Sequence, residues 1–170
     1  MKICNIISIL IISSLFLTSC SSDDTDNNNS DCGNILDQPA QGTFKGSPFI
    51  VENGTHRLQF GEYFCRIYVS DKIGGDCLFP DFGGNEGVIL FSLPNLEPQT
   101  LTLSDVSGEV NTLNFNSQAI DPPGTLIELA KCGQIEITSS TLTTVTGRLI
   151  AESREGSTIN GNFTLDLCTD

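Results

Sequence analysis

The chain has 170 residues, of which 21 are acidic, 8 are basic and 38% are hydrophobic, and its formal net charge is −13 at pH 7. A chain this acidic repels nucleic acids and anionic lipid surfaces, so nucleic-acid partners are excluded. It contains no tryptophan and 2 tyrosines, which disfavours a carbohydrate-binding module that stacks aromatic rings on sugars.

The first predicted element is a short apolar run over 3–17 that follows the basic Lys2. This layout is typical of a secretory signal peptide, and the run is shorter than the ~20 apolar residues of a transmembrane helix. We therefore predict a signal peptide at 1–19. Its removal would take away Lys2 as the only charged residue and leave a net charge of −14.

The signal ends in Leu17-Thr18-Ser19-Cys20. This tetrapeptide resembles the lipobox of bacterial lipoproteins. The resemblance implies that the thiol of Cys20 receives a diacylglycerol, that cleavage occurs just before it, and that the new amino group is acylated. A thiolate is a strong nucleophile for such a step, and several acyl chains hold a protein more firmly than one. The alternative is an ordinary cleaved signal followed by a chance cysteine.

The segment 20–31 follows as a predicted disordered tether. After Cys20 it contains no apolar residue, so it has nothing to bury. Its opening, Cys-Ser-Ser-Asp-Asp, resembles lipoproteins of Bacteroidota-type bacteria. That resemblance implies a lipid-anchored protein exported to the outer face of the bacterial outer membrane.

Residues 32–170 predict one all-β domain. Short stretches of alternating or β-rich sequence are separated by breakers such as Asn53-Gly54 and Gly83-Gly84. We expect a single antiparallel β-sandwich, with a β-barrel as the alternative. The expected strands are 41–45, 56–60, 63–70, 88–93, 100–103, 110–116, 126–130, 134–138, 142–153 and 157–168.

Three glycine-containing segments add a second resemblance. They are Gly-Thr-Phe-Lys-Gly at 42–46, Val-Thr-Gly-Arg-Leu at 145–149 and Ile-Asn-Gly-Asn-Phe-Thr-Leu at 159–165. They resemble small β-sandwich lipoproteins of unknown function from the same bacteria, which often end in a glycine-rich hairpin. This resemblance implies a fold but brings no activity or catalytic residues.

The cysteines predict disulfides, since an exported chain permits them. Cys4 leaves with the signal and Cys20 is lipidated, so five remain: Cys32, Cys65, Cys77, Cys132 and Cys168. We expect Cys65–Cys77, which brackets a turn-rich stretch, and Cys132–Cys168. Cys32 is a competitor for either partner, and the odd number leaves one cysteine over. No Cys-x-x-Cys pair supports a zinc site.

The segment 71–86 carries the weak cation candidates Asp71, Asp76, Asp81 and Glu86 among glycines. Oxygen ligands on a flexible loop suit Ca²⁺, but their spacing does not match an EF-hand. We therefore predict a solvated loop, with no metal or other cofactor, and keep calcium as the alternative.

No catalytic residue is predicted. His56 is the only histidine, and it is interpreted as an exposed residue of a turn, while the many glutamates, Glu52 among them, single out no catalytic pair. The sequence thus favours a non-enzymatic surface lipoprotein that binds an extracellular protein or glycan. The alternatives are an extracellular hydrolase with a carboxylate pair and a carrier or inhibitor that takes a small apolar ligand.

Overall fold

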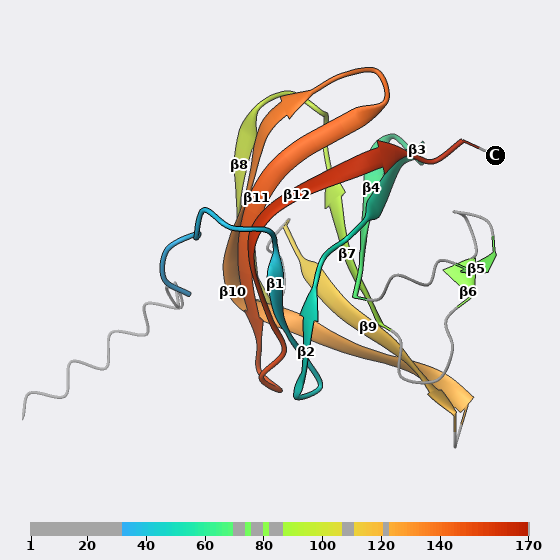
Figure 1. Cartoon of the computed structure of the whole chain (residues 1–170), viewed down its shortest axis with the longest axis vertical. Helices are drawn as coiled ribbons and strands as arrows, with labels where there is room; N and C mark the ends of the chain where they lie inside the picture. Colours follow the sequence, from blue (N-terminus) through green and yellow to red (C-terminus); the bar gives the residue numbers. More distant parts are fainter. Residues whose placement is uncertain are drawn as a thin grey trace, which may run out of the picture.

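The computed structural model describes residues 32–69, 74–75, 80–81, 87–106, 111–120 and 123–169, and this part of the chain is built from β-strands without a helix (Figure 1). The prediction of an all-β domain is confirmed. The predicted signal peptide and tether lie outside the described residues. The strands are β1 (Gln41–Phe44), β2 (Ser47–Ile50), β3 (Gly54–Gln59), β4 (Glu62–Tyr68), β5 (Gly74–Gly75), β6 (Pro80–Asp81), β7 (Gly87–Leu93), β8 (Gln99–Ser104), β9 (Leu113–Ile120), β10 (Pro123–Ser140), β11 (Thr144–Ser153) and β12 (Thr158–Leu167).

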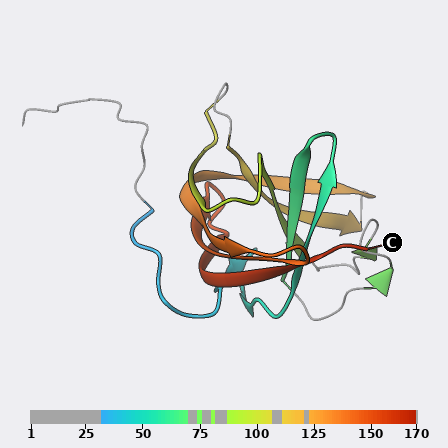
Figure 2. The ribbon, with the colours of Figure 1, turned by 90° about the horizontal axis from the view of Figure 1, so that it is seen from above.

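Seven strands close into a barrel in the order β11-β10-β9-β7-β4-β3-β12, and β12 pairs back onto β11. The barrel is mixed, because β12 runs parallel to β3 through Asp166↔Thr55 and Leu167↔His56, whereas the other pairs are antiparallel. Figures 1 and 2 show the strands curving around a shared interior. The expected sandwich is therefore not confirmed, and the arrangement observed is the barrel that stood as its alternative.

The remaining strands extend the barrel wall. β1 pairs with the first residues of β12, β2 pairs with β1, and β8 pairs with the second half of β10. The expected strands did not include β2, whose four residues contain Pro48. Pro48 is tolerated there since β2 is an edge strand, where a missing backbone donor costs no ladder bond.

β10 replaces two predicted strands, 126–130 and 134–138, by one strand of 18 residues. A bulge lies between Ala130 and Cys132, and it bends the strand so that β9 pairs with its first half and β8 with its second. Gly133 follows the bulge with a φ of 145°, a conformation that glycine adopts without strain. The expected strands stopped at 130 and resumed at 134, whereas the bulge and this glycine let one strand continue through a bend.

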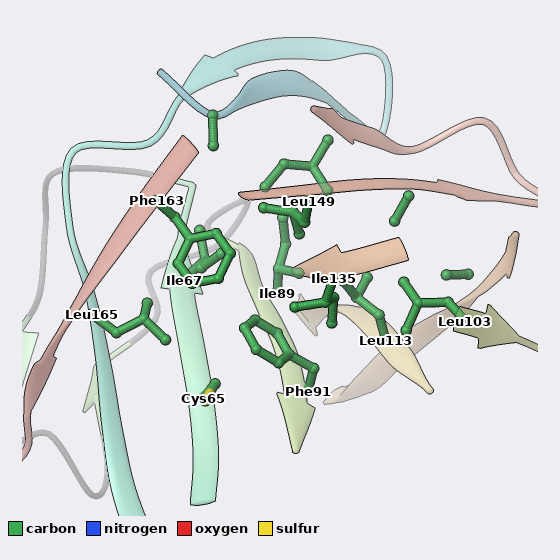
Figure 3. Packing of buried hydrophobic residues seen from close by; sticks show 14 of the residues in the cluster. Cys65, Ile67, Ile89, Phe91, Leu103, Leu113, Ile135, Leu149, Phe163 and Leu165 are labelled. Carbon is green, nitrogen blue, oxygen red and sulfur yellow. The ribbon is translucent and has the colours of Figure 1, made fainter. Parts of the chain in front are cut away.

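Apolar side chains fill the interior of the barrel (Figure 3). Each fully buried aliphatic or aromatic side chain contributes about 1.5–3 kcal/mol to folding. Phe91 and Phe163 meet edge to face, with ring centroids 5.8 Å apart. The largest fully buried side chains are Tyr68, Phe115, Ile67, Ile89, Leu93, Leu113, Ile135, Ile137, Leu149, Ile159, Leu165 and His56.

Candidate functional site

The described cysteines pair differently from the prediction. Cys32 is bonded to Cys132, with Cα atoms 5.6 Å apart and a sequence separation of 100. The predicted Cys132–Cys168 bridge is therefore wrong, and the competitor Cys32 is the partner. Cys168 is disulfide-bonded as well, and its partner lies outside the described residues.

Cys65 is a free, buried thiol, so the predicted Cys65–Cys77 bridge is also wrong. The physical reason is the direction of the side chain. On β4, Cys65 points into the barrel with Ile67, and it lies opposite Phe91 of β7 in the core. The Cys65 side chain is therefore part of the apolar core rather than of a disulfide. Burial raises the pKa of the Cys65 thiol far above its usual value, which makes the group unreactive.

His56 is buried rather than exposed in a turn, with 1% of its surface accessible. Within the described structure, neither ring nitrogen makes a hydrogen bond of normal geometry. Burial lowers the pKa of His56, although the backbone of Thr143 and the carboxylate of Asp166 oppose this shift. The imidazole is therefore neutral at pH 7 and adds to the packing of the barrel end.

The calcium prediction falls almost wholly outside the described residues. This applies to Asp71, Asp76 and Glu86, and for Asp81 only the backbone pairing of β6 with β5 is described. Elsewhere, Cys32, Cys132 and Glu152 place potential metal ligands within 4.8 Å of one another. The two sulfurs are joined in a disulfide, and the Glu152 carboxylate is ion-paired with Lys131 at 2.7 Å. These three groups are therefore already engaged in a disulfide and an ion pair, and we do not interpret them as a metal site.

Two open depressions on the outer surface share the lining residue Glu52, and we refer to the pair as the β2 groove. Their volumes are about 520 and 710 Å³. The first is lined by Asp37, Gln38, Pro39, Val51, Glu52, Asn53, Thr146, Asn162, Phe163 and Thr164. The second is lined by Gln41, Gly42, Thr43, Pro48, Phe49, Ile50, Glu52, Val69 and Thr158.

One wall of the β2 groove is the segment 36–40, called here the strap, which lies along β12. The backbone N–H of Asn162 donates to the carbonyl of Gln38 at 2.7 Å, and the N–H of Ala40 donates to the carbonyl of Asn162 at 2.8 Å. The Asn162 side chain also donates to Asp37 at 2.8 Å. These bonds fix the Asp37 carboxylate at the rim.

The glycine at position 161 makes this contact possible. Its φ is +133°, and an added Cβ would lie 2.6 Å from the carbonyl oxygen of Gln38 and 2.8 Å from the backbone of Ala40. Gly147 likewise leaves room for Phe163, since an added Cβ at position 147 would lie 2.7 Å from the Phe163 ring. The glycines of the two C-terminal motifs therefore let the strap and an aromatic ring pack closely.

The groove is acidic and rich in hydrogen-bonding groups. Asp37 and Glu52 supply carboxylates, and Asn53 supplies a side-chain oxygen that is buried without a partner among the described residues. The lining residues of the described depressions include no histidine, cysteine, lysine or arginine. Such a surface can bind polar or cationic groups, but it lacks a nucleophile paired with a base. Sequence reasoning missed Asp37, because only the strap brings it beside Glu52.

Comparisons with protein-family models, with curated proteins and with solved structures returned no match for the chain. Among the described residues, no helix has the length and apolar character needed to cross a membrane.

Proposed function

We propose that this protein is a lipid-anchored, non-enzymatic binding protein of the bacterial outer membrane, displayed at the cell surface. The anchor rests on Leu17-Thr18-Ser19-Cys20 and on the polar, acidic segment after it. The binding role rests on one observation: an open acidic groove lies on the outside of a barrel whose described interior is filled with side chains. A carrier of apolar ligands needs the opposite arrangement, a lined cavity.

The Cys32–Cys132 disulfide fixes the end of the domain at which the predicted tether would join it. Cys132 is paired with Glu152, close to the β11–β12 turn, so Cys32 holds the start of the domain at that end of the barrel. The opposite end carries Leu142 in the β10–β11 turn, where the carbonyl of Thr143 accepts a hydrogen bond from Leu167. A lipid attached at Cys20 would therefore be linked to the domain at the β11–β12 end, through the segment 20–31.

The anchor is tested by Cys20→Ala in cells fed with radiolabelled palmitate. We expect the wild-type protein to take up label and to sediment with outer membranes, and the variant to lose both properties. Protease treatment of intact cells tests display, since a surface domain is digested and a periplasmic one is protected. A variant that stays in the membrane fraction would refute the anchor.

The groove is tested by comparing wild type with Asp37→Asn and Glu52→Gln on arrays of glycans and of cationic peptides. We expect both variants to lose the bound spots, while Glu155→Gln, an exposed carboxylate in the β11–β12 turn, keeps them. The hydrolase alternative is tested on the same proteins with cell-envelope polysaccharide. Release of reducing ends that Glu52→Gln abolishes would overturn the non-enzymatic proposal.

A further inference from the structure

One stretch of the barrel wall has a free edge. The first half of β10, from Pro123 to Leu129, pairs with β9 on one side, whereas β11 begins to pair only at Ala130. In the described structure no other backbone hydrogen bond reaches this stretch. In Figure 1 this part of β10 runs with β9 away from the body of the barrel. A strand with a free edge presents unpaired N–H and C=O groups.

The directions of the peptide groups follow from a single backbone bond. The N–H of Val69 donates to the carbonyl of Gly87 at 3.3 Å, just beyond the β4–β7 ladder. Peptide groups alternate in direction along an antiparallel strand. Gly87 therefore faces β4, whereas Val88 and Leu90 face β9.

The same alternation carries across β9 to β10. Asn116 is paired with Val88. Because Val88 faces β9, Asn116 faces β7, and the next residue, Ser117, faces β10. Ser117 is paired with Leu126, and Leu126 therefore faces β9. The peptide groups of Ile127 and Leu129 consequently point to the free edge, where they can bond another strand.

The side chains at this edge are apolar and exposed. Ile127 is 57% exposed and Leu129 is 42% exposed on one face of β10, and Leu126 is 48% exposed on the other. A strand added at this edge would thus cover apolar side chains on both faces of β10. Adjacent apolar side chains on an unpaired edge mark a place where proteins add strands from a partner.

The charge of the chain selects the partner. The net charge is −13, and the cation that follows the edge, Lys131, is ion-paired with Glu152 at 2.7 Å. A second copy of this chain would bring the same excess of negative charge and would be repelled. A segment that carries lysine or arginine would be attracted.

We propose that the free edge of β10 at Ile127 and Leu129 binds an extended peptide segment of another protein, in which apolar and basic residues alternate, as an added β-strand. This inference gives the proposed binding role a protein partner, but it needs neither the lipid nor the β2 groove. The test therefore uses the soluble chain from residue 20 onward with Cys20→Ala, so failure of the anchor would leave its result unchanged.

The probe is a fluorescent eight-residue peptide of alternating lysine and valine, and binding is followed by anisotropy. Ile127→Pro removes the N–H that faces the free edge and keeps the ladder bonds to β9, which come from Leu126 and Glu128. We expect this variant to weaken binding at least tenfold. A peptide with glutamate in place of lysine should not bind, and added salt should weaken the lysine peptide.

A matched pair keeps the test decisive if Ile127→Pro does not fold. Ile127→Lys and Ile127→Glu place opposite charges at one exposed position, and thermal unfolding checks that both fold. We expect Ile127→Glu to bind the lysine peptide more tightly than wild type, and Ile127→Lys to bind it more weakly.

Three results would overturn the proposal. One is the absence of binding up to millimolar peptide, and another is equal binding by both charge variants. The third is a dimer in sedimentation velocity that Ile127→Lys abolishes, because the occupant would then be a second copy of the chain.

Discussion

Removing the Cys32–Cys132 bond should destabilise the domain substantially. The bond closes a loop with a sequence separation of 100. In the chain-entropy model, the crosslink of a 100-residue loop lowers the entropy of the unfolded chain by an amount worth about 4.7 kcal/mol at 25 °C. Measured losses on removing native disulfides are typically about 2–5 kcal/mol. We therefore expect Cys32→Ser/Cys132→Ser to lower the free energy of unfolding within that range.

The assay is equilibrium unfolding in urea without reductant, followed by far-ultraviolet circular dichroism. The double variant should also show a larger dependence of the free energy on urea, because its unfolded chain exposes more surface. Cys65→Ala is the matched control. It removes a buried sulfur but no crosslink and should cost about 1 kcal/mol.

Two results would refute this reasoning. The double variant could lose no more stability than Cys65→Ala, which would mean that the crosslink does not restrict the unfolded chain. Peptide mapping of the folded protein could instead recover Cys132 bonded to Cys168, which would contradict the pairing itself.

Three further predictions concern single residues. Gly161→Ala should lower the free energy of unfolding by about 3 kcal/mol, since its Cβ would meet the strap. Gly156→Ala, which has a φ of +93° but open space around it, should cost only about 1 kcal/mol in the same urea titration. The Cys65 peptide should stay unlabelled by iodoacetamide at pH 8 until urea unfolds the protein, because burial raises the pKa of its thiol; labelling of the folded protein would contradict the buried position. Burial lowers the pKa of His56 in the folded state, so the unfolded chain binds its proton more readily, and stability should fall as the pH drops below about 6.5. His56→Phe should flatten this part of the pH profile, and an unchanged profile would assign the loss to other groups.

Much of the β-structure could be predicted locally. β12 alternates between inward residues such as Ile159 and Phe163 and outward residues such as Asn162, and this period of two is visible in the sequence. The local pattern failed at a proline and a glycine that the tertiary structure places inside strands. Pro48 lies in β2 because that strand pairs with β1 on one side only, and Gly133 lies inside β10 because a bulge bends the strand there.

The candidate site could be predicted only in part. Glu52 was one of many glutamates, and nothing in its neighbourhood linked it to Asp37. The two share a depression because the backbone of Asn162 holds the strap against β12. A contact between residues more than 120 positions apart leaves no periodic signal in either segment.

The sequence by itself predicted the processing of the chain and correctly gave its all-β class. Signal peptides, lipobox motifs and strand alternation depend on neighbouring residues, so they can be recognised one segment at a time. Only the tertiary structure decided the closure of the barrel, the Cys32–Cys132 bond and the inward position of Cys65. Each of these depends on which distant strands pair and in which register. A register shift of one residue would turn every side chain of a strand to the other face, and a single sequence does not specify that choice.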